Sequence, residues 1–260
     1  MTLSPSGPVL FIGHGSPMNA IRDTPFTQAL AAIGRDFPAP QAVLCISAHW
    51  VTKGARTTAM ERPRTIHDFY GFPKALFDID YPARGEPGLA ARAAVLANGA
   101  VDRTEWGLDH GAWAPLRRIY PAAHIPVVQM SIDATLSPDA MVAVGRALCA
   151  LRDEGVMILG SGNIVHNLRD IDFNDLAPAR DYATAFDAAI ARMIAERDIA
   201  ALSAAPVASA DGRRSVPTAE HYLPLLYVMG AVRDTDRLNM RYAAIENASI
   251  SMRTFSFEAQ

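Results

Sequence analysis

Short apolar runs of the length of buried strands alternate with stretches of helical periodicity along the chain. The predicted strands cover residues 8–12, 42–47, 125–132 and 156–159, and two strand-like runs lie within residues 239–257. Helices are predicted after the Thr24-Pro25 pair, from Ser137 to Gly155, and over residues 86–98, 182–197 and 218–229. Strands that alternate with helices indicate an α/β fold, with a mostly parallel central sheet covered by helices on both faces.

Neither a repeat nor a low-complexity tract divides the chain. Residues 200–210 look like a linker, but they are too few to separate two domains. A length of 260 residues suits one large α/β domain, so residues 1–260 are predicted to form a single domain. Residues 52–75 form a long irregular segment, and loops of this length inside a domain are usually functional when they are ordered.

Composition and charge exclude several classes of protein. The chain is 50% hydrophobic and 20% charged, which indicates a folded core, and its net charge of −3 argues against nucleic-acid or electrostatic membrane binding. Cys45 and Cys149 are too few for a disulfide framework, and both lie in apolar runs, so buried thiols are expected. Neither a signal-peptide pattern nor an apolar stretch of about 18 residues is present, so we expect a cytoplasmic protein.

Three histidines stand at or shortly after the ends of predicted strands. His14 follows the first strand, His49 follows the second, and His166 follows the glycine-rich turn at residues 160–163. The carboxyl ends of parallel strands meet at one edge of a sheet, so these side chains are expected to converge there. Imidazole is a common ligand of zinc and of iron, although each histidine could instead be a hydrogen-bonded turn residue. His124 precedes a strand and is expected at the opposite edge, on the surface.

Several familiar catalytic motifs are absent or incomplete. The chain has no HExxH motif, so a zinc protease site on a helix is excluded. Residues 13–16 do not have the GxSxG order of a nucleophile elbow. Residues 160–162 resemble the start of a dinucleotide-binding turn, but the third glycine is missing at the required spacing, so phosphate binding there is weakly supported.

Six short motifs occur in a fixed order over nearly the whole chain, from about Val9 to Phe255. They are GHGSPM at 13–18, SAHW at 47–50, TIHDFYGFP at 65–73, LDHGAW at 108–113, GSGN followed by HNL at 160–168, and EHYLPL at 220–225. Together they resemble the class III extradiol ring-cleavage dioxygenases, which are related to the catalytic subunit of protocatechuate dioxygenase. The similarity is greatest to the DOPA-dioxygenase branch of this superfamily.

The resemblance implies a role for each of five histidines. His14, His49 and His221 match the metal ligands of this branch, whereas the wider superfamily has a carboxylate as the third ligand. Glu220 stands beside His221, and in a helix the two would point about 100° apart, so only one could face the metal. The resemblance also implies that His166 is an acid/base catalyst and that His110 is a second histidine near the substrate, although either could merely order the pocket.

The activity implied by the resemblance is extradiol cleavage of a catechol-type, DOPA-like ring with O2, which gives a semialdehyde acid. One divalent metal ion is expected, Fe(II) for activity, with Zn(II) as the alternative occupant. Residues 65–73 are predicted at the mouth of the pocket on the carboxyl edge of the sheet. The aromatic residues predicted to line the pocket, each of which could instead pack in the core, are Trp50, Phe69, Tyr70, Phe72 and Trp113.

Two other classes of function remain open at this point. A zinc-dependent hydrolase could use the same ligands to activate water. A non-enzymatic metal-binding relative could share the fold without the reaction. The expected partners are a small aromatic diol and O2, with no nucleic acid and no membrane, and the protein is expected as a monomer or a small homo-oligomer.

Overall fold

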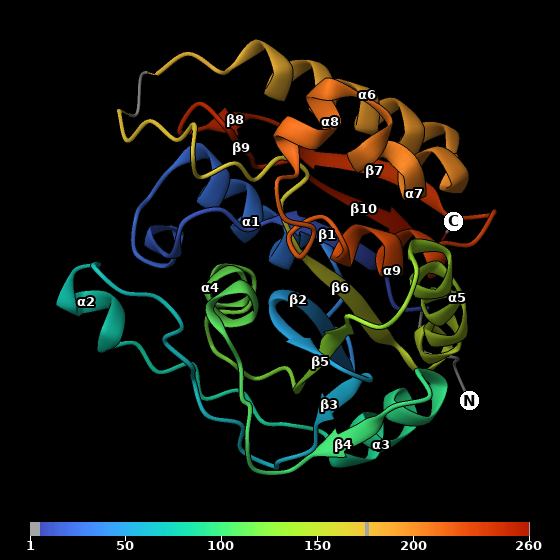
Figure 1. The fold of residues 1–260 in the computed structure, drawn as a ribbon. Helices are drawn as coiled ribbons and strands as arrows, with labels where there is room; N and C mark the ends of the chain where they lie inside the picture. The colour runs from blue at the N-terminus through green and yellow to red at the C-terminus, as the bar shows by residue number, and fades with distance from the viewer. Residues whose placement is uncertain (1–5, 175–176, 260) are drawn as a thin grey trace.

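An eight-stranded sheet forms the centre of the computed structural model, which describes residues 6–174 and 177–259. Its strand order is β4-β3-β5-β2-β6-β1-β10-β7, as Figure 1 shows from bottom to top. The strands are β1 (Val9–Gly13), β2 (Ala42–Thr52), β3 (Arg56–Thr58), β4 (Ala100–Asp102), β5 (Val127–Asp133), β6 (Val156–Gly162), β7 (Arg237–Tyr242) and β10 (Thr254–Glu258). A separate pair consists of β8 (Ile245–Glu246) and β9 (Ile250–Ser251).

The centre of the sheet is parallel. Strand β6 pairs in parallel with both β1 and β2, and β2 also pairs in parallel with β5. Antiparallel pairs join β10 to β1 and to β7 on one side, and β3 to β5 on the other. The prediction of a mostly parallel α/β sheet is confirmed, and the parallel strands β1, β2 and β6 all end at the same edge.

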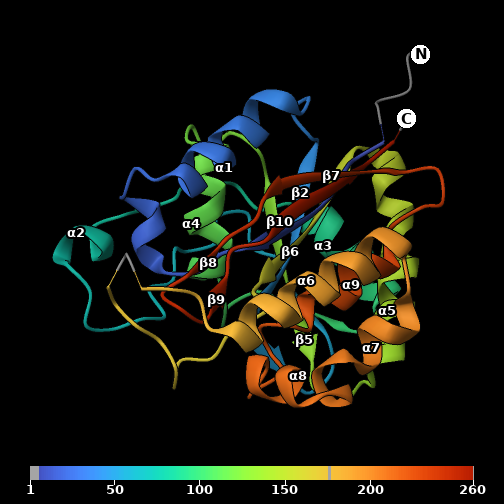
Figure 2. The ribbon, with the colours of Figure 1, turned by 90° about the horizontal axis from the view of Figure 1, so that it is seen from above.

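Helices cover both faces of the sheet, as Figure 2 shows from above. The described helices are α1 (Pro25–Asp36), α2 (Lys74–Phe77), α3 (Pro87–Leu96), α4 (His110–Ile119), α5 (Pro138–Leu148), α6 (Asp181–Glu196), α7 (Ile199–Ala208), α8 (Ala210–Ser215) and α9 (Pro224–Gly230), with short 3₁₀ turns η1 (Pro17–Ala20) and η2 (Cys149–Glu154). Alternate residues of β1 enter opposite cores: Val9 and Phe11 pack with α3, α5, α6, α7 and α9, whereas Leu10 and Ile12 pack with α1 and α4.

Local sequence signals explain where the predicted helices begin. Thr24 caps α1 by accepting from the Thr27 amide at 3.2 Å, and Thr27 in turn accepts from the Thr24 amide at 2.9 Å. Pro25 fits the first turn because a helix leaves that N–H unpaired. Ser137 caps α5 in the same way. Among the described residues, no helix is both long and apolar enough to cross a membrane.

Three sequence-based expectations are wrong in detail, and one helix was not expected. Helix α9 begins at Pro224 rather than at residue 218, so Glu220 and His221 lie in turns and the argument from helical spacing does not apply. The proposed linker at 200–210 is mostly helix α7, whose apolar side is buried at Leu202. Helix α4 was not predicted, because Pro115 interrupts its pattern. Both cysteines are free, but only Cys45 is buried, whereas Cys149 begins the half-buried turn η2.

Candidate metal centre

Three histidines from distant parts of the sequence meet at the carboxyl edge of the sheet. His14 directly follows β1, His49 lies near the end of β2, and His221 lies in the turn before α9. Their ligand nitrogens all lie within 4.8 Å of one another. The ring centroid of His14 is 5.0 Å from that of His49 and 5.4 Å from that of His221. This cluster, His14-His49-His221, is the candidate metal centre.

The geometry of strand β2 gives His49 its position. We expected this strand to end before His49, but β2 continues to Thr52. Its pairing with β5 shifts register between Ile46 and Val51, so the segment that carries His49 leaves the regular ladder. His49 is therefore held at the edge by strand structure on both sides of it, which fixes its side chain more firmly than a free loop would.

Close backbone approach at Gly162 brings His221 to the end of β6. A Cβ atom on Gly162 would lie 2.1 Å from the carbonyl oxygen of His221, so only glycine fits there. That same carbonyl accepts a hydrogen bond from the Asn163 amide at 2.8 Å. The glycines at residues 160–162 belong to strand β6 and allow α9 to pack against it, which explains them without a bound phosphate.

A hydrogen-bond chain defines the tautomer of His14. Its Nδ1 lies 3.0 Å from Ser161 Oγ, and the Ser161 hydroxyl donates to the Gly111 carbonyl at 2.5 Å. That carbonyl is available because the residue four positions on is Pro115, which has no N–H to donate within α4. Since the only Ser161 proton is used, His14 Nδ1 must be the donor, and Nε2 keeps its lone pair.

Carboxylates favour the same tautomer in the other two histidines. Asp68 Oδ2 lies 3.3 Å from His49 Nδ1, and Glu220 Oε1 lies 3.1 Å from His221 Nδ1. Each carboxylate favours a proton on Nδ1 and leaves the lone pair on Nε2. Burial, followed by the nearby histidines, lowers the pKa of His14 and of His221 well below its usual value, so both rings are neutral at neutral pH.

This donor set fits a divalent metal ion. The Nε2 atoms of His14 and His49 are 3.1 Å apart, and in the assigned tautomers neither carries a hydrogen. Two lone pairs at this distance repel unless a cation lies between them. Neighbouring ligands held about 2.1 Å from one metal ion are themselves separated by roughly 3.0–3.4 Å, so the observed spacing suits such an ion.

Two further histidines lie against the cluster. The ring of His166 stacks on that of His221, with centroids 3.5 Å apart and an interplanar angle of 8°. Burial lowers the pKa of His166 to about 4, so this half-buried imidazole is also neutral at neutral pH. His110 opens helix α4, and its ring centroid lies 4.0 Å from that of His49. The five histidines singled out from the sequence therefore form one group.

The predicted aromatic residues divide into two sets. Phe69 lies edge-on to His110 at 5.6 Å between centroids, and Phe72 packs on Phe69 at 5.4 Å. Trp113 is fully buried beneath them. Tyr70 is 92% exposed, and Trp50 is buried in a stack on Trp106. The loop at residues 65–73 thus lies beside the candidate metal centre, but the described contacts link only part of it to the histidines.

Two polar residues of this site were not singled out from the sequence. Asp68 contacts His49 and His110, and Ser161 contacts His14. Both stand inside motifs that were recognised, directly after His67 in one case and between two glycines in the other. An acid next to a histidine motif and a hydroxyl at a strand end are the available signals, because metal-ligating histidines usually donate their second N–H to such groups.

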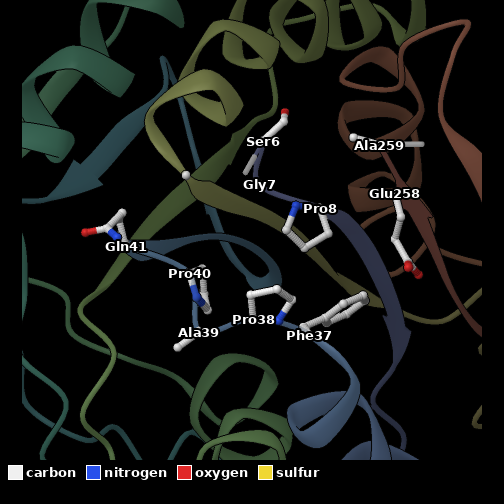
Figure 3. A pocket seen from close by; sticks show the side chains of 11 residues that line it. Ser6, Gly7, Pro8, Phe37, Pro38, Ala39, Pro40, Gln41, Glu258 and Ala259 are labelled. Atoms are coloured by element: carbon white, nitrogen blue, oxygen red, sulfur yellow. The ribbon is translucent and has the colours of Figure 1, made fainter. Parts of the chain in front are cut away.

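A separate pocket lies at the opposite edge of the sheet, where β1, β2 and β6 begin. Figure 3 shows proline and other mostly apolar side chains around it. Among the described residues that line it, none is a histidine and Glu258 is the one acidic residue. His124 is exposed at the start of β5, as expected. The histidine cluster at the carboxyl edge therefore remains the candidate site.

Comparison with known proteins agrees with this site. Residues 6–253 match the family described as the catalytic LigB subunit of aromatic ring-opening dioxygenase. A 4,5-DOPA dioxygenase extradiol from Escherichia coli K12 is 43% identical over 252 residues, which cover 94% of this chain and 92% of that protein. A protein of the same name from Beta vulgaris is 32% identical over 259 residues, which cover 95% of each chain.

A solved structure has the same fold. The crystal structure of an uncharacterized protein from Escherichia coli K12 superposes with a TM-score of 0.82 at 38% identity, covering 96% of this chain and 99% of that one. The chain therefore belongs to the LigB family and is an extradiol aromatic ring-opening dioxygenase. The resemblance noted in the sequence is confirmed, and neither a hydrolase nor a non-enzymatic relative is favoured.

Proposed function

We propose that the protein cleaves a catechol-type, DOPA-like ring with O2 and gives a semialdehyde acid. In this reaction the ring C–C bond between one hydroxyl-bearing carbon and its neighbour without a hydroxyl breaks, and both oxygen atoms of O2 enter the product. The observation that carries the proposal is the convergence of three Nε2 lone pairs beside two further imidazole groups, those of His166 and His110. The names of the two similar proteins support a DOPA-like substrate.

His14, His49 and His221 would hold one divalent metal ion, with Fe(II) expected for activity and Zn(II) able to occupy the same ligands. When bound, the ion supplies a Lewis acid for the catechol oxygens and, as Fe(II), the redox chemistry for O2. Three neutral ligands leave its +2 charge uncompensated, which favours an anionic catecholate. Ser161 and Glu220 would orient His14 and His221, since each accepts the Nδ1 proton of its partner.

Proton transfer is assigned to His166 and substrate positioning to His110. The His166 imidazole is neutral and, among the described residues, makes no side-chain hydrogen bond, so its nitrogens are free to take a proton from a catechol hydroxyl and to return one later. His110 donates Nδ1–H to Asp68, which leaves its Nε2 for a hydrogen bond with the substrate.

The aromatic loop would pack against the flat ring of the substrate. Phe69 contacts His110 and is supported by Phe72, so it is the residue of the loop best placed for a ring contact. We assign the whole chain, residues 1–260, to one catalytic domain. The two free cysteines favour the cytoplasm, where thiols stay reduced.

The test is anaerobic loading of metal-free protein with Fe(II), followed by addition of oxygenated L-DOPA, catechol or protocatechuate. Expected results are yellow product and uptake of one O2 per ring, with both atoms of ¹⁸O2 in the product. Zn(II)-loaded protein and His14→Ala should be inactive, whereas His124→Ala, which changes an exposed histidine at the other edge, should retain activity. Turnover of none of these diols by the Fe(II) protein would contradict the proposal.

A further inference from the structure

Among the described residues, Asp68 is the one carboxylate that lies within 4.0 Å of ring nitrogens of two histidines of the site. Its Oδ2 accepts a hydrogen bond from His110 Nδ1 at 3.0 Å and lies 3.3 Å from His49 Nδ1. Its Oδ1 accepts from the backbone amide of His110 at 2.9 Å. Both oxygens therefore face the site: two N–H groups of His110, on α4, donate to them, and His49 Nδ1, on β2, lies close to Oδ2.

Asp68 reaches the site from a different part of the fold. It belongs to the irregular segment between β3 and α2, which Figure 1 shows passing below α4 on the way to α2. The next residue, Phe69, packs on His110, and the Trp113 indole donates to the Ile66 carbonyl at 2.8 Å. The loop at 65–73 is thus joined to the histidines by the Asp68 carboxylate and the Phe69 ring, and to α4 by the hydrogen bond from Trp113.

We propose that Asp68 is a positioning residue through which metal binding at His49 orders both His110 and the loop at residues 65–73. The inference rests on the proposed metal site. A cation on His49 Nε2 makes its Nδ1–H a stronger donor, which tightens the contact with Asp68. Asp68 in turn orients the ring of His110 and holds the start of the loop at residues 65–73, so one side chain connects the proposed ligand His49, His110 and this loop.

Asp68→Asn is the most direct change, because the amide has the same shape but only one acceptor oxygen. In either orientation its NH2 group faces an N–H of His49 or His110, so at least one of the three contacts is lost. Asp68→Glu keeps the charge and should restore part of the effect. Asp80→Asn is the matched control, because Asp80 lies just after α2 and accepts a hydrogen bond from Thr65, at the start of the same loop, at 2.8 Å rather than contacting a histidine.

The experiment measures Zn(II) affinity by competition with a chelator, and amide hydrogen exchange of residues 65–73 with and without Zn(II). Wild-type protein and Asp80→Asn should bind one ion and protect the loop. Asp68→Asn should bind about 10- to 100-fold more weakly and lose the protection, with Asp68→Glu in between. Melting of the metal-free proteins checks that each variant is folded.

Wild-type affinity together with metal-dependent loop protection in Asp68→Asn would overturn the proposal. So would two ions per wild-type chain and one in Asp68→Asn, because Asp68 would then be a ligand itself. Neither measurement uses a catechol or O2. If the wild type orders its loop on Zn(II) but cleaves no catechol with Fe(II), the proposed reaction fails while the role of Asp68 stands.

Discussion

His166 and His221 lie face to face, with ring centroids 3.5 Å apart and planes only 8° from parallel. The lone pairs of an imidazole lie in the plane of its ring, so two parallel rings at this distance do not aim at one point. His221 Nδ1 is already directed to Glu220, which leaves its Nε2 for the cluster. The stacking therefore separates the proposed ligand His221 from the proposed proton carrier His166.

His166→Phe should leave the metal content unchanged and lower kcat/KM by about 10²- to 10⁴-fold, the usual effect of losing an acid/base group. Phenylalanine keeps a flat ring against His221 but has no nitrogen to carry a proton. Metal analysis and steady-state O2 uptake measure the two quantities. Loss of metal in His166→Phe, or near-normal turnover, would contradict a proton-transfer role for His166. His110 would then be the next candidate for the proton-transfer group.

Gly162→Ala should destabilise the protein and weaken metal binding together. The added Cβ would meet the His221 carbonyl oxygen at 2.1 Å, so the turn that carries this proposed ligand must move. Strain of this kind costs about 1–3 kcal/mol. Gly88→Ala is the control, because its Cβ meets the flexible end of Glu86 instead. Thermal melting with and without Zn(II) reports both effects, and equal behaviour of the two variants would refute the packing argument.

Phe69→Leu should raise KM for an aromatic diol by about 2- to 12-fold, the equivalent of losing an aromatic contact of roughly 0.5–1.5 kcal/mol. Tyr70→Leu should leave KM unchanged, because Tyr70 is 92% exposed and has no ring contact among the described residues. Initial rates over a range of substrate concentrations measure this difference. The reverse order of the two effects would place the ring contact on Tyr70.

Asp236 should contribute a stability that disappears in acid. Burial opposes its ionisation, but two hydrogen bonds from Arg152, at 2.6 and 2.8 Å, and one from the Arg233 amide outweigh it and hold its pKa below the usual value. Because the pKa is lower in the folded state, the ionised carboxyl contributes its full stabilisation above the unfolded pKa of about 3.9. This stabilisation is lost as the pH falls from there toward the folded-state pKa.

Asp236→Asn leaves the buried Arg152 charge uncompensated, so it should cost about 3–5 kcal/mol at pH 7. The difference from wild type should shrink at pH 3, where the Asp236 carboxyl of the unfolded wild-type chain binds a proton more readily than that of the folded protein. Urea unfolding of both proteins at the two pH values measures this. A difference that grows in acid would contradict the assigned direction of the pKa shift.

The strand-end rule was enough to predict that His14 and His49 converge, because hydrophobic runs reveal the strands and parallel strands end together. The position of His221 could be anticipated only through the resemblance. Its turn depends on a backbone approach at Gly162, and periodicity carries no information about contacts between distant segments. Helical periodicity also placed the start of α9 too early, since Pro224 fixes the first turn.

The groups that orient the histidines were beyond such reasoning. Asp68 is 42 residues from His110, and Ser161 is 147 residues from His14. Polar contacts at these separations depend on how loops close over the sheet edge, and no local pattern predicts that closure. The free Gly111 carbonyl follows from Pro115 only once helix α4 is known.

The pairing of β1 with β10 has a consequence for biosynthesis. Strand β1, which leads into His14, lies between β6 and β10, with Val9 opposite Phe257, 248 positions later in the sequence. While the ribosome is still elongating the chain, one edge of β1 has no partner, and His221 has not yet arrived beside His14. The candidate metal centre therefore forms only after residue 221 has been synthesised, so a translation product that stops before it lacks one of the three proposed ligands.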